Sequence, residues 1–269
     1  MSRSQFTALE RLEQCQSVED MLRAFPSRDD RFAPFDDPVI ARLYDALLAS
    51  DRASMIKSAT NDFCAAIGRV KKGAHFVDVG CGSGRTLLDL AGRFSQSKCA
   101  FVGVDPSVEM IAIAKENYKR QRNPKNVSFL CGHLNNVLVA KRTQNTDYMI
   151  IRNTVSWMAD SAAELRIWLE RLKPGGQIMI REIRRDAFFP LLKARVRRCL
   201  AFKAGDLTLA YPPSAMVAAY RSALTVGKLV AILNRFGITI TIERPRKHDD
   251  VTAEPWGVDM FLVGEKARD

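Results

Sequence analysis

Residues 75–94 read HFVDVGCGSGRTLLDLAGRF, and this stretch determines the fold that we expect for the whole chain. Its apolar start, which contains the single acidic residue Asp78, predicts a strand buried on both faces. Three glycines then follow at alternate positions: Gly80, Gly82 and Gly84. Apolar residues recur at helical spacing to the end of the stretch. A strand, a glycine-rich turn and a helix in this order favour a nucleotide site, because glycine lets a ligand approach the backbone and a helix N-terminus attracts anionic groups. A tight turn without a ligand is the alternative.

A second buried strand, residues 99–105, ends in Asp105. Asp105 follows Gly84 by 21 residues, close to the spacing of about 20 at which an acidic residue holds ribose hydroxyls. Because parallel strands end at the same edge of a sheet, we expect the glycine turn and Asp105 to meet on one ligand. The glycine spacing is G-x-G-x-G, whereas dinucleotide sites have G-x-G-x-x-G, which argues against a nicotinamide cofactor.

The motif DVGCGSG at residues 78–84 resembles the first motif of the class I S-adenosylmethionine-dependent methyltransferases. Four later segments resemble the following motifs of that family in the right order: residues 102–117, 126–137, 146–158 and 169–183. The resemblance implies a Rossmann-like α/β fold, with a seven-stranded, mostly parallel sheet, helices on both faces and an antiparallel last strand. It also implies S-adenosyl-L-methionine as the cofactor and, as the reaction, in-line methyl transfer to a small molecule in specialised metabolism.

The resemblance further implies a set of cofactor-binding residues. The glycine loop would hold the methionine end, Asp105 the ribose, and Pro106 with Met110 the adenine. Asp78 is expected to order the loop rather than to touch the reacting atoms. His133 stands where relatives often carry an acidic residue that binds the adenine amine, and a surface role is its alternative. The complete expected set is Asp78, Gly80, Cys81, Gly82, Gly84, Asp105, Pro106, Met110, Gly132, His133, Leu134, Arg152 and Asn153.

No residue pattern identifies a general base. Candidates for contact with the acceptor or for catalysis are Tyr44, Trp157, Tyr220 and His248, with Glu182 as a further candidate base. Tyr44 and Trp157 have core packing as their alternative role. The loop after the fourth strand lacks the N/D-P-P-Y/F pattern of planar-amine methyltransferases, which argues against DNA adenine or protein glutamine as the acceptor.

Residues 1–70 show helical spacing on either side of a charged loop at 28–38, and they predict a helical N-terminal cap before a methyltransferase domain at 71–269. Within that domain we expect a helix at 161–172 capped by Ser161, a fifth strand at 176–183 and a helix at 220–236.

Residues 184–213 do not fit the alternation of strands and helices, and they predict a helical insertion after the fifth strand that forms a substrate lid above the edge where ligands bind. Aromatic residues and four basic side chains there suit an anionic, partly apolar substrate: Lys193, Arg195, Arg197 and Arg198. A solvated helix face is the alternative.

The composition is that of a globular protein, with 47% hydrophobic and 26% charged residues and a net charge of +11. This charge suits an anionic substrate, an acidic surface, nucleic acid or merely a solvated basic surface. We therefore keep two alternatives, an RNA or protein methyltransferase and a non-catalytic S-adenosylmethionine-binding partner subunit, with nucleic acid as the less favoured partner.

The expected location is the cytoplasm. The N-terminus carries charges where a signal peptide needs an apolar run, and no stretch approaches the ~20 apolar residues of a membrane span. Six cysteines without a C-x-x-C pair indicate reduced thiols rather than a zinc site or a disulfide framework. We expect no metal and no membrane partner.

Overall fold

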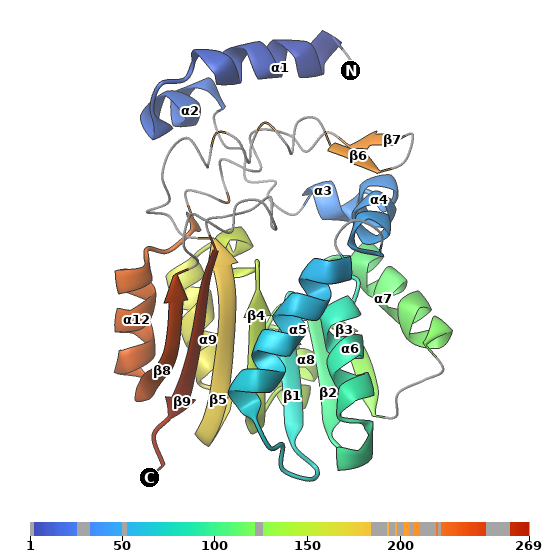
Figure 1. The fold of residues 1–269 in the computed structure, drawn as a ribbon, viewed down its shortest axis with the longest axis vertical. Helices are drawn as coiled ribbons and strands as arrows, with labels where there is room; N and C mark the ends of the chain where they lie inside the picture. The colour runs from blue at the N-terminus through green and yellow to red at the C-terminus, as the bar shows by residue number, and fades with distance from the viewer. Residues whose placement is uncertain are drawn as a thin grey trace.

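The computed structural model describes residues 3–25, 33–49, 53–121, 126–183, 222–245 and 259–268, together with positions 193, 197, 202–204, 207–209 and 219. A seven-stranded sheet in the order β3-β2-β1-β4-β5-β9-β8 forms its centre (Figure 1). The strands are β1 (His75–Val79), β2 (Ala100–Asp105), β3 (Val127–Cys131), β4 (Thr146–Arg152), β5 (Leu172–Ile183), β8 (Ile238–Pro245) and β9 (Asp259–Lys266). Strands β1 to β5 pair in parallel, whereas β9 runs antiparallel to both of its neighbours. The expected fold class is confirmed.

Helices cover both faces of the sheet, which explains why the parallel strands are continuous apolar runs. One face is covered by α5 (Ala53–Ile67), α6 (Arg85–Arg93) and α7 (Val108–Arg120), and the other by α8 (Val137–Arg142), α9 (Ser161–Leu169) and α12 (Val226–Arg235). Each set packs on the sheet through its own apolar cluster, with Phe63 and Leu87 in one and Leu165 and Leu233 in the other.

Four expected boundaries are wrong. The N-cap of α9 is Asp160, whose side chain accepts a hydrogen bond from the Ala163 N–H group, while the Ser161 hydroxyl donates to backbone carbonyls instead. This helix ends at Leu169, and β5 starts at Leu172, before the Pro-Gly-Gly sequence, because residue 172 already pairs with β4. The helix expected at 220–236 starts at 226 with Thr225 as its N-cap, and residues 220 and 221 lie outside the described part.

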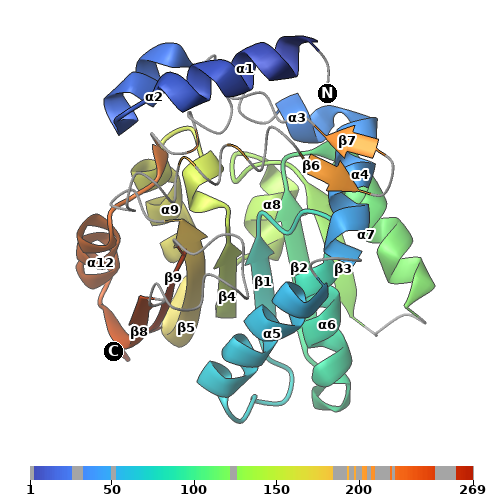
Figure 2. The same cartoon turned by 45° about the horizontal axis from the view of Figure 1, so that its top comes forward.

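The N-terminal helices lie above the carboxyl edge of the sheet (Figures 1 and 2). They are α1 (Arg3–Gln14), α2 (Val18–Ala24), α3 (Ala33–Asp36) and α4 (Pro38–Ala49). A capping box at Ser17 starts α2 and confirms the expected break there. The segment expected to be a loop at 28–38 contains the short helix α3, and residues 26–32 lie outside the description.

The region predicted to be a lid is described only in part. Its short strands β6 (Phe202–Ala204) and β7 (Leu207–Leu209) pair antiparallel and lie against α4. Positions 193 and 197 are helical, and the remainder of 184–213 lies outside the described residues.

Cysteine chemistry and helix length bear on the expected cellular location. The cysteines within the described residues are free thiols: Cys15, Cys64, Cys81, Cys99 and Cys131. Cys199 lies outside them. Of the helices that the structure describes, none has the length and apolar character needed to cross a bilayer.

Candidate functional site

The glycine loop connects β1 to α6 in a backbone conformation that favours glycine at three positions. Gly80, Gly82 and Gly84 have φ angles of +68°, +52° and +76°. Space is also restricted, because a Cβ atom on Gly80 would lie 2.8 Å from the Cβ atom of Thr154, and one on Gly84 would lie 2.7 Å from the ring of Phe129. The alternating glycines therefore satisfy both the turn and the close packing around it.

Asp105 ends β2 and reaches the glycine loop, as the sequence predicts. Its carboxylate accepts hydrogen bonds from the Gly82 N–H group at 2.8 Å and from the Ser107 N–H group at 2.9 Å. The residue is only 9% exposed, and burial raises its pKa to about 6 although both N–H groups and nearby His133 lower it. The carboxylate thus fixes the loop at the end of β2 and keeps lone pairs for further donors.

Asp78 is buried at 2% exposure beside the same loop. Burial raises its pKa to about 7, with Arg152 lowering the value and Asp105 raising it. Among the described residues its carboxylate accepts no hydrogen bond, and the Oδ1 atom of Asn153, at φ +51°, is also buried there without a partner. Burying a carboxylate or an amide oxygen without a hydrogen bond is costly, so the Asp78 carboxylate and the Asn153 Oδ1 atom fit a ligand that brings cationic or hydrogen-bond-donating groups.

Glu182 has a different role from that of the candidate base. It is fully buried near the end of β5, and its Oε2 atom accepts hydrogen bonds from the N–H groups of Thr154 at 2.7 Å and Val155 at 2.6 Å. Its Oε1 atom accepts the Ser156 hydroxyl at 3.0 Å. Glu182 therefore fixes the loop after β4, which continues into the short helix η2 (Val155–Trp157). The expectation that it acts as a base is not supported by these contacts.

Three aromatic rings from distant segments of the chain meet at the segment after β4, which carries Trp157. The ring of Phe35 on α3 lies 5.3 Å from that of Trp157 and 5.5 Å from that of Tyr44, both edge-on at 76° and 74°. The Phe35 carbonyl also accepts the Ser107 hydroxyl at 2.7 Å. We name Phe35, Tyr44 and Trp157 the aromatic trio. The structure brings the candidates Tyr44 and Trp157 together through Phe35, which was not among the expected site residues.

The remaining expected residues lie at the carboxyl ends of the first four strands. Met110 is buried with Tyr44 packed against its cluster, and the Gly132 N–H group donates to the Asp105 carbonyl at 3.0 Å. Burial raises the pKa of Cys81 well above its ordinary value, so its side chain stays a neutral thiol. His133 is exposed, while half-buried positions are occupied by Pro106, Leu134 and Arg152. Tyr220 and His248 lie outside the described residues.

Comparisons with known sequences agree with this arrangement. A family model described as a methyltransferase domain matches residues 70–219. The carboxy-S-adenosyl-L-methionine synthase of Trichodesmium erythraeum (strain IMS101) is 29% identical over 113 residues, which are 41% of this chain and 43% of that protein. The ubiquinone biosynthesis O-methyltransferase of Coxiella burnetii (strain RSA 493 / Nine Mile phase I) is 28% identical over 115 residues, 43% of this chain and 46% of that protein. The chain spans about half the length of the curated relatives that it matches.

Solved structures share the fold. The plantazolicin methyltransferase BamL, crystallised with a desmethyl analogue and SAH, has a TM-score of 0.62 at 16% identity and covers 94% of this chain and 100% of its own. The [4+2]-cyclase SpnF has a TM-score of 0.54 at 16% identity, with 79% and 82% covered. At these identities the likeness establishes the fold alone, and the fold serves methyl transfer in one protein and cyclisation in the other.

Proposed function

Because the chain belongs to the class I S-adenosylmethionine-dependent methyltransferases, we propose that it transfers the methyl group of S-adenosylmethionine to a small molecule with an aromatic or apolar body. The observation that carries this proposal is the arrangement of the glycine loop, Asp78 and Asp105 at one edge of the sheet beneath the aromatic trio. The ubiquinone biosynthesis O-methyltransferase named above supports a small acceptor, since its name refers to the synthesis of a small molecule.

Each part of the cofactor has a chemically suitable partner. We assign the ribose hydroxyls to Asp105, whose oxygens each have a lone pair beyond their backbone hydrogen bond. The N–H groups at the start of α6 suit the methionine carboxylate, because a helix N-terminus favours anions. The cationic amino group suits Asp78, a buried carboxylate with no hydrogen bond from the described residues. Pro106 and Met110 are assigned to the adenine.

S-adenosylmethionine supplies a methyl group that its sulfonium already makes electrophilic. The residues of the chain therefore have to orient the acceptor and exclude water, and orientation alone can contribute ~7–11 kcal/mol. Glu182 fixes the loop that carries Trp157, and α4 carries Tyr44, so two of the three rings are held by buried contacts. Such rings suit a flat or apolar acceptor body.

The expected anionic part of the substrate has less support than the aromatic part. Lys193 donates to the backbone carbonyls of Glu13 and Cys15, both at 2.9 Å, and Arg197 pairs with the Glu13 carboxylate at 2.5 Å. Two of the four basic residues thus attach the 184–213 segment to the end of α1. Arg195 and Arg198 lie outside the described residues, so the proposal rests on an aromatic or apolar acceptor.

The N-terminal cap of residues 1–70 and the 184–213 lid together cover the proposed site. Two sets of contacts support this: residues 193 and 197 bind the end of α1, and β6 and β7 lie against α4. This division, with a methyltransferase domain at 71–269, is part of the proposal. The free thiols support the cytoplasm as the proposed location, because reducing compartments keep cysteines unpaired.

Calorimetric titration with S-adenosylmethionine and S-adenosylhomocysteine tests the cofactor assignment. We expect micromolar binding of at least one, and a loss of at least about tenfold in Asp105→Ala, since a charge-assisted hydrogen bond is worth about 1.5–3 kcal/mol. The control is Asp89→Ala, which removes only an ion pair with Arg93 on the outside of α6. Absence of binding by the folded wild type would contradict the proposal.

Acceptor screening tests the substrate class. Methyl transfer from the cofactor to aromatic or lipid-like small molecules, followed by mass spectrometry, is the expected result. RNA is the second candidate, favoured by the net charge of +11. Binding of RNA that weakens steeply as salt is raised, together with methylation of RNA and of none of the small molecules, would replace the small-molecule proposal.

A further inference from the structure

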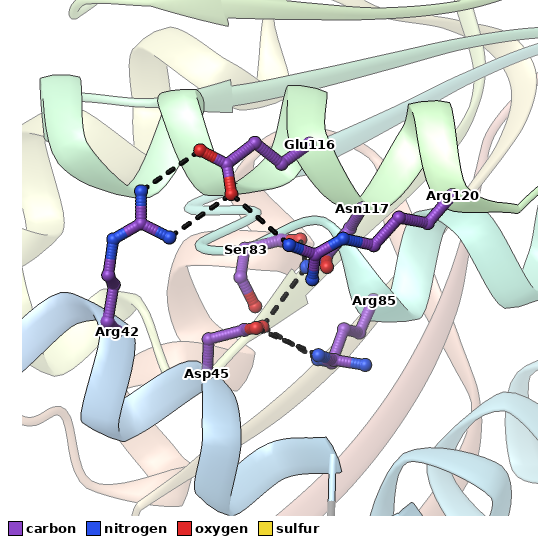
Figure 3. Close-up of polar contacts among 7 residues, drawn as sticks. All are labelled: Arg42, Asp45, Ser83, Arg85, Glu116, Asn117 and Arg120. Atoms are coloured by element: carbon purple, nitrogen blue, oxygen red, sulfur yellow. Dashed lines mark hydrogen bonds and ion pairs between the residues drawn. The ribbon is translucent and has the colours of Figure 1, made fainter.

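An ion pair whose side chains are 22% (Arg85) and 11% (Asp45) exposed joins the N-terminal cap to the first residue after the glycine loop (Figure 3). Asp45, on α4, receives two hydrogen bonds from the Arg85 guanidinium, from Nε at 2.7 Å and from Nη2 at 2.8 Å. Arg85 is the first residue of α6 and directly follows Gly84. The two residues are 40 positions apart in the chain, so this contact forms only when α4 lies over the loop.

Asn117, on α7, adds a second connection between the same elements. Its Nδ2 atom donates to the Asp45 carboxylate at 3.1 Å and to the Ser83 carbonyl, within the glycine loop, at 3.0 Å. Figure 3 shows Asp45 between the Arg85 and Asn117 side chains. Asp45 is therefore connected to the glycine loop in two ways. It binds Arg85, which directly follows the loop, and it binds Asn117, which also holds the Ser83 carbonyl within the loop.

A third connection runs to the other half of the candidate site. The Ser107 hydroxyl donates to the Phe35 carbonyl on α3, while the Ser107 N–H group donates to Asp105, which in turn accepts the Gly82 N–H group. Helix α3 is thus hydrogen-bonded to Ser107, which bonds the ribose carboxylate Asp105, and helix α4 is hydrogen-bonded to Arg85 at the start of α6. Movement of these helices would disturb the loop and the ribose carboxylate together.

The Asp45–Arg85 pair is less exposed than a second ion pair of α4, the one between Arg42 and Glu116. Burial raises the pKa of Asp45, but the Arg85 guanidinium together with neighbouring polar side chains such as Asn117 more than offsets this and brings the pKa below its ordinary value, so the pair is ionised at neutral pH. Arg42 and Glu116 also join α4 to α7 with two hydrogen bonds, at 3.1 and 3.0 Å, yet their side chains are 59% and 38% exposed. Exposed pairs contribute little, whereas removing one partner of a buried pair leaves an uncompensated charge.

We propose that Asp45 is a positioning residue through which α4 holds the glycine loop, so that cofactor binding and the seating of α4 on the domain are coupled. The inference rests on the proposed function, because it concerns the same cofactor site. Thermodynamic linkage makes the coupling reciprocal: a bound cofactor stabilises the seated α4, and a seated α4 raises the affinity for the cofactor by the same factor.

The test measures S-adenosylhomocysteine affinity by calorimetry in the wild type, in Asp45→Asn and in the matched control Arg42→Ala. Asp45→Asn should weaken binding about tenfold, within the range typical of coupled sites, and Arg42→Ala should change it less than about twofold. Hydrogen exchange provides the second measurement. S-adenosylhomocysteine should slow exchange of the α4 amides in the wild type and do so much less in Asp45→Asn. A purely structural role would lower the melting temperature without changing either measurement well below melting.

Arg85→Lys serves as a second variant if Asp45→Asn does not fold. Lysine keeps the charge but not the two-pronged contact, so affinity should fall by a smaller factor than in Asp45→Asn. A double-variant cycle uses Asp45→Asn, Arg85→Gln and the two changes combined. The combined variant should bind S-adenosylhomocysteine no more weakly than whichever of the two single variants binds it more weakly, because the two residues act through each other.

The outcomes separate this inference from the proposed function. Absence of S-adenosylhomocysteine binding by the folded wild type overturns both. Binding by the wild type, with equal affinity in Asp45→Asn or Arg85→Lys and with unaltered protection of α4, overturns the coupling alone.

Discussion

Replacing Asp78 by asparagine should stabilise the free protein at pH 8 and at the same time weaken its binding of S-adenosylhomocysteine. The carboxylate is buried, and burial raises its pKa from 3.8 to about 7, with Arg152 opposing the rise and Asp105 adding to it. Its ionised form therefore lowers the stability of the folded protein until a cationic ligand group arrives. Asparagine has nearly the same size and carries no charge at any pH.

The sign of the effect follows from proton binding. Between the pKa of the unfolded chain and that of the folded protein, the folded state binds more protons, so the free energy of unfolding decreases as the pH rises through this range. A tenfold change in proton affinity is worth about 1.4 kcal/mol, which gives a cost on the order of 4 kcal/mol at pH 8. The gain of Asp78→Asn should therefore be about 2 to 4 kcal/mol at pH 8 and shrink toward zero near pH 4.

Urea unfolding of both proteins at several pH values between 4.5 and 8 measures this difference. The control is Asp160→Asn, because Asp160 is an exposed N-cap where asparagine caps as well as aspartate, so its stability difference should not grow with pH. Parallel stability curves for Asp78→Asn and the wild type would refute the reasoning, as would a variant that is less stable at pH 8. Calorimetry completes the test, since unchanged affinity for S-adenosylhomocysteine would remove Asp78 from the cofactor site.

Three further predictions concern the same edge of the sheet. Binding of S-adenosylhomocysteine at pH 6.5 should release protons, because its ammonium group and ribose hydroxyls lower the raised pKa values of Asp78 and Asp105. Calorimetric titration in buffers of different ionisation enthalpy measures this release, and net proton uptake would contradict it. Gly80→Ala should destabilise the protein by roughly 2 to 4 kcal/mol through its left-handed backbone and its contact with Thr154, whereas Gly92→Ala, with open space inside α6, should stabilise it by about 0.5–1 kcal/mol in thermal unfolding. Glu182→Gln should lower the free energy of unfolding by about 1.5–3 kcal/mol and weaken cofactor binding. The control Glu265→Gln changes a partly exposed residue and should alter the free energy of unfolding by no more than about 0.5 kcal/mol. Equal effects of the two variants in urea unfolding and calorimetry would count against the loop-fixing role of Glu182.

The sheet was predictable because its strands are specified locally. Buried parallel strands are continuous apolar runs, and the turn residues between them mark their ends, so the expected strands that begin at residues 75 and 99 agree with the structure within about two residues. The start of β5 was wrong for a physical reason: Leu172 joins the sheet by pairing with Thr146, 26 positions earlier in the chain. A contact between distant backbone segments has no local signal, whereas the Pro-Gly-Gly sequence has a strong one.

The site divides in the same way. Asp105 could be found because its distance from the glycines follows from the topology of one strand-helix-strand unit. Asp45, Phe35 and the loop-fixing contacts of Glu182 could not, since each residue acts through a partner 28 to 72 positions away that only the folded chain brings near. Each of these residues also has an ordinary local interpretation, as an exposed helix position, a loop aromatic or a strand-end carboxylate.

Four buried carboxylates lie around the glycine loop. Their surroundings, rather than their residue type, determine which of them hold protein segments and which remain available to a ligand. Asp45 faces a guanidinium, and Glu182 accepts two N–H groups and a hydroxyl, so the hydrogen bonds of both are directed to holding protein segments. Asp105 accepts two N–H groups and keeps a raised pKa, while Asp78 accepts no hydrogen bond from the described residues. A ligand with hydroxyl and ammonium groups lowers the electrostatic cost of the last two alone. In the proposed site, the two carboxylates that destabilise the free protein are therefore the ones expected to contribute binding energy for the cofactor, while Asp45 and Glu182 fix the segments beside them.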